Sequence, residues 1–341
     1  MAGSLCRAAI LGPQNTQGVR VLPGDPMSVV FFGSPPLAAT VLQALLDAHI
    51  PVTAVVTQPD KPAGRGNQLK APAVKVLALA RGLQVYQPVK VRDGALAEWL
   101  RQQHAELAVV VAYGRILTQE VLDAPRLGCV NLHASLLPRW RGASPIARAI
   151  AAGDSASGMC LMRMDAGLDT GAVLARAELP IGPGDTTPML EAKLADAGAA
   201  LLLDNWSALM ANRLVAQPQP LQGITWAPPL DKGEGRLDWQ RKATQLHCQI
   251  RAMQPWPGAF FASAAAPAED WKVFAEGLQL SERSGPPGQV LAVEGPLVWI
   301  GCGDGALGVA ELQRPGKGRA AAADVLRGLR LGVGGQLGVV S

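Results

Sequence analysis

Residues 29–57 read VVFFGSPPLAATVLQALLDAHIPVTAVVT, a pattern that predicts a strand, a helix and a second strand. The β-branched and aromatic run Val29–Phe32 predicts a buried strand, and Val52–Thr57 predicts another of the same kind. Between them, Leu37–Ala48 has the apolar spacing of a helix that packs one face on a core. This alternation of strands and helices is typical of a parallel sheet covered by helices.

The same alternation continues to about residue 210. Further strands are predicted at Val85–Gln87, Leu107–Ala112, Cys129–Leu132, Met159–Met162 and Val173–Leu179. Further helices are predicted at Ala73–Ala80, Leu96–His104, Gln119–Asp123, Ile146–Ala151 and Met189–Met210. We therefore expect an α/β domain over residues 27–210, with a mostly parallel, Rossmann-like sheet and helices on both faces.

A different pattern follows this domain. Residues 211–232 are rich in Pro, Gln and Gly, which indicates a linker. Residues 233–330 hold one predicted helix, Ala243–Ala252, and then short runs between turn residues, as in a small, OB-like β-barrel. Its strands are predicted at Phe260–Phe261, Trp271–Phe274, Gln289–Val293, Leu297–Gly301 and Leu307–Glu311.

The two ends of the chain lack periodicity. Residues 331–341 are rich in glycine and are expected to form a loose tail. Residues 1–26 are expected to be a disordered leader or a mis-assigned start, because Met27 directly precedes the first predicted strand. An organelle transit peptide is the less favoured alternative, since this segment is neither Ser-rich nor amphipathic.

Composition limits the class of protein. Of the 341 residues, 49% are hydrophobic and 17% charged, and the net charge of +4 leaves room for an anionic partner without demanding one. The five cysteines form no CxxC pair, which argues against a zinc ribbon or a disulfide framework and favours the cytoplasm. All apolar runs are too short and too interrupted for a membrane span. Since no apolar stripe is left over, we expect a monomer.

The most informative motif lies at the end of a central strand. Residues 131–142 read NLHASLLPRWRG. Strand alternation places Asn131 and His133 on one face, at the sheet edge where open α/β folds bind ligands. An amide can stabilise a developing oxyanion, and an imidazole can carry protons near neutral pH. The pair therefore predicts acyl transfer, whereas the alternative is a histidine buried with a satisfied partner.

A second motif supplies a carboxylate. Residues 164–171 read MDAGLDTG, in which flanking glycines permit a tight loop that presents Asp169 to a cleft. Asp165 is the competing candidate, although it can equally cap the turn. A hydrolase with Ser135 as nucleophile is disfavoured because no G-x-S-x-G elbow surrounds it. Cys129 is more plausible as a buried filler than as a nucleophile, and the four histidines show no metal-ligand spacing.

A third motif is basic. Residues 57–70 read TQPDKPAGRGNQLK and follow the second predicted strand, at the same sheet end as the other two motifs. Its Pro and Gly residues predict an irregular loop. Lys61, Arg65 and Lys70 outweigh its one acid, so the loop is suited to binding phosphates, whereas the alternative is a solvated surface loop. Neither G-x-G-x-x-G nor a Walker A motif occurs, so nothing predicts dinucleotide binding.

Together these motifs resemble the folate-dependent formyltransferases, from about Met27 to about Arg330. The resemblance implies a catalytic trio of Asn131, His133 and Asp169, and 10-formyltetrahydrofolate as co-substrate with no metal. It also implies folate contacts by the segment that follows the trio's histidine, namely Ser135, Leu136, Leu137 and Pro138. Relatives that formylate glycinamide ribonucleotide or amino-sugar nucleotides share these motifs, so the motifs specify the chemistry and not the acceptor.

Two other features point to the acceptor. Residues 58–66 resemble the tRNA-binding insertion of family members that act on methionyl initiator tRNA, and Ile250–Gly258 resembles a motif of their C-terminal domain. This implies tRNA contacts by Lys61, Arg65 and Lys70. The sequence departs from the pattern at Gln254, usually Asn, and at Pro36-Leu37, usually Asp-Phe. The C-terminal domain is nearly charge-balanced, so its charge alone does not predict RNA binding. The alternatives are a formyltransferase for another amine, such as a sugar nucleotide or glycinamide ribonucleotide, and a catalytically silent RNA-binding protein.

Overall fold

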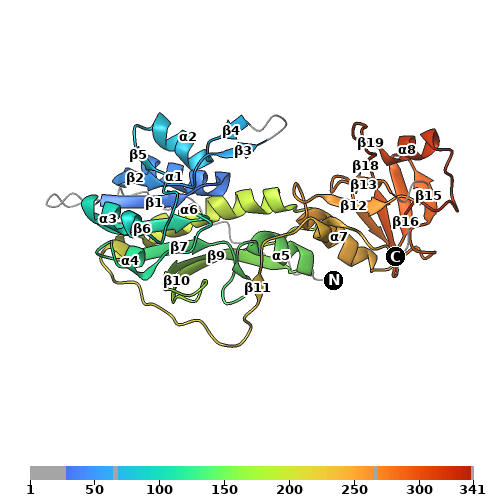
Figure 1. Cartoon of the computed structure of the whole chain (residues 1–341). Coiled ribbons are helices and arrows are strands. Elements are labelled where there is room, and N and C mark those ends of the chain that lie inside the picture. The colour runs from blue at the N-terminus through green and yellow to red at the C-terminus, as the bar shows by residue number, and fades with distance from the viewer. Residues whose placement is uncertain (1–27, 64–67, 265–267, 339–341) are drawn as a thin grey trace.

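The N-terminal part of the molecule is built on one seven-stranded sheet with the order β10-β9-β7-β6-β1-β2-β5. The structure is a computed structural model and describes residues 28–63, 68–264 and 268–338 (Figure 1). The strands are β1 Ser28–Gly33, β2 Val52–Val56, β5 Gln84–Tyr86, β6 Ala105–Val111, β7 Cys129–His133, β9 Ala156–Arg163 and β10 Val173–Pro180.

The sheet is mostly parallel, as predicted. Strands β5, β2, β1, β6 and β7 run in one direction, whereas β9 pairs antiparallel with β7, and β10 pairs antiparallel with β9. Side-chain alternation alone could not predict this reversal, because it does not encode strand direction. The five parallel strands bring their carboxyl ends to one edge of the sheet, where α/β folds place their ligands.

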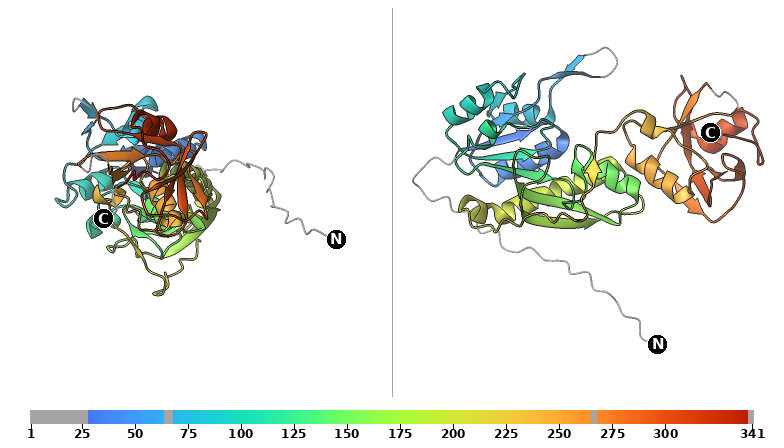
Figure 2. Two further views of the ribbon diagram at one scale, coloured as in Figure 1. Left: turned by 90° about the vertical axis from the view of Figure 1, so that its right-hand side faces the viewer. Right: turned by 60° about the horizontal axis from the view of Figure 1, so that its bottom comes forward.

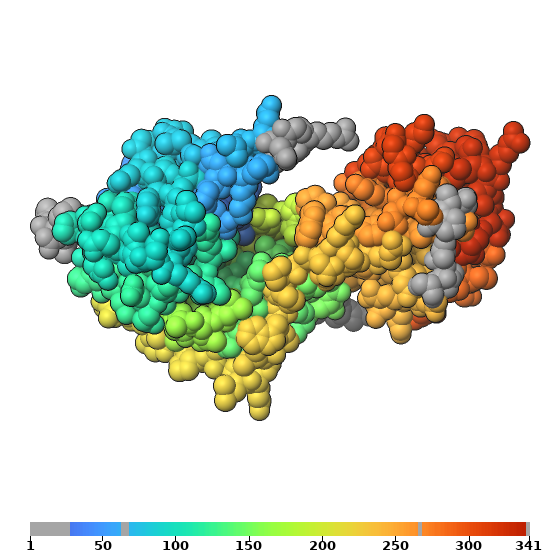
Figure 3. Space-filling view, in the orientation of Figure 1, coloured from blue at the N-terminus to red at the C-terminus, as the bar shows by residue number. Residues whose placement is uncertain are grey.

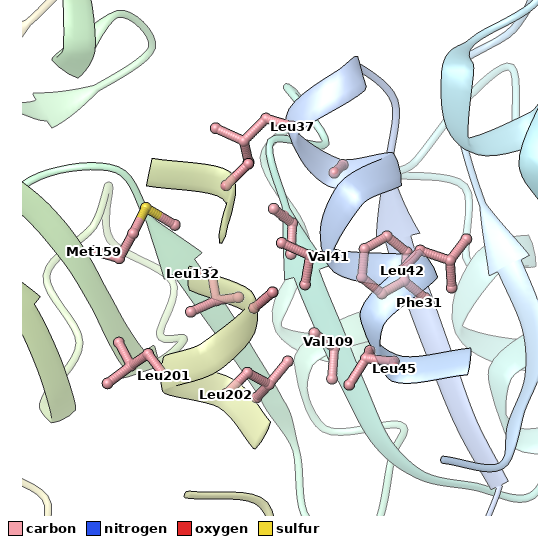
Figure 4. Packing of buried hydrophobic residues seen from close by; sticks show 14 of the residues in the cluster. Phe31, Leu37, Val41, Leu42, Leu45, Val109, Leu132, Met159, Leu201 and Leu202 are labelled. Carbon is pink, nitrogen blue, oxygen red and sulfur yellow. The ribbon is translucent and has the colours of Figure 1, made fainter. Parts of the chain in front are cut away.

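Helices cover both faces of the sheet. The helices α1 Pro36–Asp47, α2 Ala73–Ala80 and α6 Thr187–Met210 pack on one face, and the shorter α3 Ala95–Gln102 and α4 Gln119–Leu122 pack on the other. Figure 4 shows the first face, where α1 and α6 side chains meet those of the strands. The labelled members are all buried: Phe31, Leu37, Val41, Leu42, Leu45, Val109, Leu132, Met159, Leu201 and Leu202.

The basic segment differs from the prediction. It forms a two-stranded hairpin of β3 Lys61–Ala63 and β4 Gln68–Lys70, which projects from the domain (Figure 2). The expected irregular loop is therefore wrong for these six residues, while residues 64–67 lie outside the described ranges. Pro62 does not prevent the pairing, because a two-stranded ribbon needs no N–H donor on its outer side.

The C-terminal part has its own core. Two four-stranded antiparallel sheets, of order β12-β13-β18-β19 and β14-β17-β16-β15, enclose buried Trp239, Phe261 and Trp271, which confirms the small barrel. Short strands β14, β18 and β19 and helix α8 were not predicted. The elements are α7 Ala243–Ala252, β12 Ala259–Ala262, β13 Asp270–Val273, β14 Gln279–Ser281, β15 Val290–Glu294, β16 Leu297–Gly301, β17 Ala306–Val309, β18 Glu311–Gln313, β19 Ala320–Ala321 and α8 Ala322–Gly328.

The expected loose tail is also corrected. Leu337 is 1% exposed and belongs to the barrel core. Gln336 and Gly338 form antiparallel bridges to Gln289 and Ser263. Glycine content predicted looseness, but in residues 331–338 the glycines allow the backbone to lie closely against the barrel. Residues 1–27 and 339–341, which include the predicted leader, lie outside the described ranges.

Polar contacts join the two parts. Helix α5 (Pro145–Ala152) packs on α7, and Arg148 of α5 forms an ion pair with Glu234 at the start of the C-terminal part. Thr187 Oγ1 donates to the carbonyl of Ala252 at 2.7 Å, and Arg251 donates to the carbonyl of Asp185 at 3.0 Å. None of the helices in the described ranges is long and apolar enough to cross a membrane.

Candidate active site

A cleft of about 860 Å³ opens at the carboxyl ends of the parallel strands. Figure 3 shows the surface hollowed between the N-terminal part and the yellow and orange segments that follow it. Asn131, His133 and Asp169 all line the cleft, although the last two are 36 positions apart in the chain. A cleft of this size suits a small organic substrate.

The orientation of His133 is set by two contacts. Its Nε2 lies 2.9 Å from the carbonyl oxygen of Trp140, which can only accept, so Nε2 carries a hydrogen and donates it. Its Nδ1 lies 3.6 Å from Oδ2 of Asp169. The ring is 6% exposed. The other ring nitrogen, Nδ1, therefore faces the Asp169 carboxylate.

The Asp169 carboxylate is held from outside its own loop, by the backbone of β8 (Arg141–Gly142). Its Oδ2 accepts a hydrogen bond from the backbone N–H of Gly142 at 2.8 Å. Asp165, the competing candidate, instead caps the turn: its Oδ1 accepts from Gly167 N at 3.1 Å and Thr170 Oγ1 at 2.6 Å. The structure thus separates the two carboxylates into one that shapes the loop and one that faces His133.

Asn131 completes the group. It lies two residues before His133 on β7 and is 9% exposed. It is on the same strand face as Cys129, which packs in the core between the sheet and helices α3 and α4. Among the described residues, no protein group hydrogen-bonds to its side-chain amide. A buried amide without a protein partner at a cleft wall is available to a ligand.

Three residues in the loops around the cleft have left-handed backbone conformations. Of the seven non-glycine residues with positive φ in the described ranges, these are Ala112, Trp140 and Asp169, with φ of 45°, 63° and 53°. Such left-handed conformations cost about 1–3 kcal/mol each and persist only where the surroundings enforce them. The backbone around Gly171 is too closely packed for a side chain, because a Cβ atom there would lie 1.8 Å from the carbonyl oxygen of Arg163.

We expect Gly171→Ala to lower both stability and turnover. Relieving the overlap costs about 1–3 kcal/mol and shifts the loop that carries Asp169. The melting temperature should fall by several degrees and kcat should fall too. Gly184→Ala is the matched control, since a Cβ atom at Gly184 would meet nothing within 4 Å. Equal melting temperatures and turnover for the two variants would show that the loop tolerates the change.

The segment predicted to contact folate is mostly turned inward. Ser135 is fully buried and its Oγ donates to the carbonyl of Arg139 at 2.6 Å, and Leu137 is 1% exposed in a small core cluster. Neither these two nor Leu136 and Pro138 are among the residues that line the cleft. The structure gives the segment a role in shaping the loop after β7, and its folate contacts stay a prediction.

The rival nucleophiles are inaccessible. Burial raises the pKa of the Cys129 thiol to about 12, and Cys129 is 3% exposed, as expected of a filler. Ser135 directs its hydroxyl to a backbone carbonyl rather than to His133. Within the described residues, no group of three or more His, Cys, Asp or Glu side chains could hold a metal ion. A mechanism without a protein nucleophile fits these positions best.

Two of the three predicted tRNA contacts lie on the described strands of the hairpin. Lys61 and Lys70 are exposed and occupy facing positions of β3 and β4. Like charges opposite one another destabilise a ribbon unless an anion binds between them. Lys75 is different, since it pairs with Asp60 at 2.8 Å. Arg65 lies outside the described residues.

Several residues in or beside the cleft were not predicted from the sequence. Trp226, 55% exposed on β11 (Trp226–Ala227), lines the cleft from within the segment interpreted as a linker. Glu191 of α6 also lines it, and burial raises the pKa of its carboxyl. Gln219 bonds the backbone of the Asp169 loop. No local pattern marks them, because each reaches the site through tertiary folding.

Comparison with known proteins agrees with this geometry. Residues 27–205 match the family described as formyl transferase, and residues 229–330 match its C-terminal domain. The methionyl-tRNA formyltransferase of Stenotrophomonas maltophilia is 48% identical over 310 residues, 90% of this chain and 100% of the relative. The chain belongs to the methionyl-tRNA formyltransferase family. Another family member, from Thiobacillus denitrificans, is 47% identical and covers 92% of this chain and 100% of itself.

Solved structures show the same formyltransferase fold. The N-formyltransferase of Helicobacter canadensis, in complex with folinic acid and dTDP-3-aminofucose, has a TM-score of 0.64 at 18% identity, covering 84% of this chain and 99% of its own. WlaRD, a sugar 3N-formyl transferase, has a TM-score of 0.63 at 17% identity, covering 86% and 100%. Identities this low show a shared fold and do not identify the acceptor of this family member.

Proposed function

We propose that this protein transfers the formyl group of 10-formyltetrahydrofolate to the α-amino group of methionyl initiator tRNA. The observation that carries the proposal is the convergence of Asn131, His133 and Asp169 on one cleft, in a chain 45–48% identical to methionyl-tRNA formyltransferases over about nine-tenths of its length. We further propose that the enzyme works as a monomer in the cytoplasm.

The chemistry requires one bond to form and one to break. The neutral methionyl amine attacks the formyl carbon, giving a tetrahedral intermediate whose oxygen is negative. Neutral His133 takes the proton of the amine on Nδ1 as the new bond forms. The Nδ1–H formed in this way and the Asn131 amide then donate hydrogen bonds to the negative oxygen, and such donors accelerate acyl transfer by stabilising the developing charge. Holding both substrates in one geometry supplies a further part of the rate.

The proton that the amine loses is taken up by the folate. The amine loses one proton on forming the new C–N bond, and N10 of the folate gains one as the old C–N bond breaks. His133 Nδ1, 3.6 Å from the Asp169 carboxylate, is placed to carry that proton between the two nitrogens. Asp169 stabilises the imidazolium while the proton is in transit.

The cleft offers a suitable place for a flat heteroaromatic ring. Ile116 and Leu168 line it and are 61% and 48% exposed, so they present apolar surface to a bound ligand. Tyr113, Leu117 and Met164 continue the same wall. Apolar walls with a few polar groups at one end are typical of small-molecule sites, so these residues support folate binding.

We expect Lys61→Glu/Lys70→Glu to raise the KM for charged tRNA about tenfold or more, since two phosphate contacts become repulsive. The salt dependence of that KM should weaken, whereas kcat and the KM for the folate should stay within about twofold. Arg176→Glu/Arg213→Glu, which reverses two exposed arginines at the far edge of the sheet and beyond α6, is the matched control. An equal effect of the two pairs would contradict a specific role for the hairpin.

One assay tests the acceptor. The enzyme is given 10-formyltetrahydrofolate with methionyl initiator tRNA, methionyl elongator tRNA, free methionine or a dTDP-amino sugar, and the formylated product is measured by mass spectrometry. We expect efficient formylation of initiator tRNA alone. Formylation of the amino sugar in its place would mean that the acceptor is a sugar nucleotide, and no product with any acceptor would favour a catalytically silent protein.

A further inference from the structure

The segment between the two domains is bonded to both loops of the cleft. Strand β11 pairs in parallel with β8 (Arg141–Gly142), which follows the Asn131 motif. Upstream, Gln217 and Val173 exchange backbone hydrogen bonds of 2.9 and 2.8 Å, directly after the Asp169 loop, residues 165–171. Residues 217–227 are therefore a part of the active site's framework as well as a connection.

Gln219 occupies the middle of this segment and uses both ends of its amide. Its Nε2 donates to the carbonyl oxygens of Asp169 and Gly171, each at 2.8 Å. Its Oε1 accepts from Nε and Nη2 of Arg141 at 3.1 and 2.7 Å. Arg141 is 7% exposed, so its guanidinium is a fixed support rather than a mobile surface charge. One side chain thus connects the two cleft loops.

The Asp169 loop needs such a support. Asp169 has a φ of 53°, a left-handed conformation that the surroundings must enforce. The carbonyl oxygens of Asp169 and Gly171, on either side of Thr170, both accept hydrogen bonds from Nε2 of Gln219. Gly142 N donates to the Asp169 carboxylate at 2.8 Å, so the loop is held through its backbone and through its side chain.

Apolar packing does not account for the position of the segment. Val215 and Leu221, on either side of Gln219, are 77% and 89% exposed. Pro218 and Pro220 flank Gln219 directly and offer no N–H donors. The middle of the segment is therefore held in place by the hydrogen bonds of Gln219. Its ends are held by the backbone pairs, by the hydrogen bond from Trp140 N to Thr225 Oγ1 at 2.9 Å and by the buried Ala227.

The geometry points to Gln219 as a positioning residue for formyl transfer. Together with Arg141, Gln219 fixes the Asp169 loop against β8. It also connects that loop to the segment that leads into the C-terminal domain. This inference rests on the proposed function for its reaction. It adds that the interdomain segment sets the placement of Asp169 relative to His133, so that the segment controls turnover rather than only joining two domains.

The test compares three variants of the full-length enzyme. Gln219→Leu keeps the size and removes all four hydrogen bonds. Gln219→Glu keeps the acceptor for Arg141 but has no N–H to donate to the loop. Gln217→Leu is the matched control, because the Gln217 side chain is exposed and its bonds to Val173 are made by the backbone.

We expect kcat for formyl transfer to fall about 10- to 100-fold in both Gln219 variants, as when a reacting group is misplaced by about 1 Å. The KM values for folate and tRNA should stay within about threefold, and Gln217→Leu should match the wild type. Amide hydrogen exchange of residues 165–171 should be faster in the Gln219 variants and unchanged in the control, with β6 and β7 protected in all.

Two results would overturn the inference: equal kcat in Gln219→Leu and Gln217→Leu, or wild-type turnover in Gln219→Glu. Failure of the proposed function is recognised separately, because the wild type would then not formylate charged initiator tRNA. The hydrogen-exchange comparison needs no substrate, so unchanged exchange of residues 165–171 in Gln219→Leu would refute the positioning role in that case as well.

Discussion

Replacing Asn131 by alanine should lower kcat for formyl transfer by about 10²–10³-fold, which is the usual cost of losing one oxyanion donor. The amide lies at the cleft wall beside His133, 9% exposed and without a hydrogen bond to any described protein group. It is therefore free to donate to the formyl oxygen once that oxygen becomes negative. The loss should appear in kcat and leave the KM for the folate within a few-fold, because the interaction strengthens only in the transition state.

Single-turnover measurements with saturating folate and charged tRNA provide the test. Asn131→Asp is the informative second variant, since it keeps the shape of the side chain but places a negative charge where a donor is needed. It should be at least as impaired as Asn131→Ala. Melting temperatures should show that both variants fold. Turnover near the wild-type rate in Asn131→Ala would remove this residue from the mechanism.

The sheet and the shared strand face of Asn131 and His133 could be predicted because both depend on local patterns. Side-chain alternation along β7 places Asn131 and His133 on one face whatever the rest of the chain does. The glycines at 167 and 171 indicate a tight loop, and the loop indeed turns Asp169 toward His133. No local pattern specifies how close Asp169 lies to His133. The fold brings Oδ2 of Asp169 to 3.6 Å from Nδ1 of His133.

The errors came from interpreting composition as disorder. Proline and glycine in residues 57–70 suggested an irregular loop, but an isolated hairpin tolerates Pro62. Glycine in residues 331–338 suggested a loose tail, but Leu337 is buried in the barrel. The proline-flanked Gln219 resembled linker sequence because its three partner residues, Arg141, Asp169 and Gly171, are distant in the chain. Such contacts form only in the folded chain, so a local sequence pattern cannot predict them.

Replacing Asp169 by asparagine should lower kcat by about 10²-fold or more while leaving the loop in place, since loss of proton-transfer assistance typically costs that much. An asparagine oxygen can still accept the hydrogen bond from Gly142 N, and Gln219 holds the loop through backbone carbonyls that the substitution does not touch. The change therefore removes the negative charge that faces His133 Nδ1 and little else.

This separates the charge of Asp169 from the position of its loop. Hydrogen exchange of residues 165–171 should be unchanged in Asp169→Asn and faster in Gln219→Leu, although both variants lose turnover. Asp169→Glu keeps the charge but lengthens the side chain beside the 3.6 Å approach to Nδ1, and it should recover only part of the rate. If Asp169→Asn turned over like the wild type, the carboxylate would be a structural acceptor for Gly142, and proton transfer would have to proceed through His133 without it.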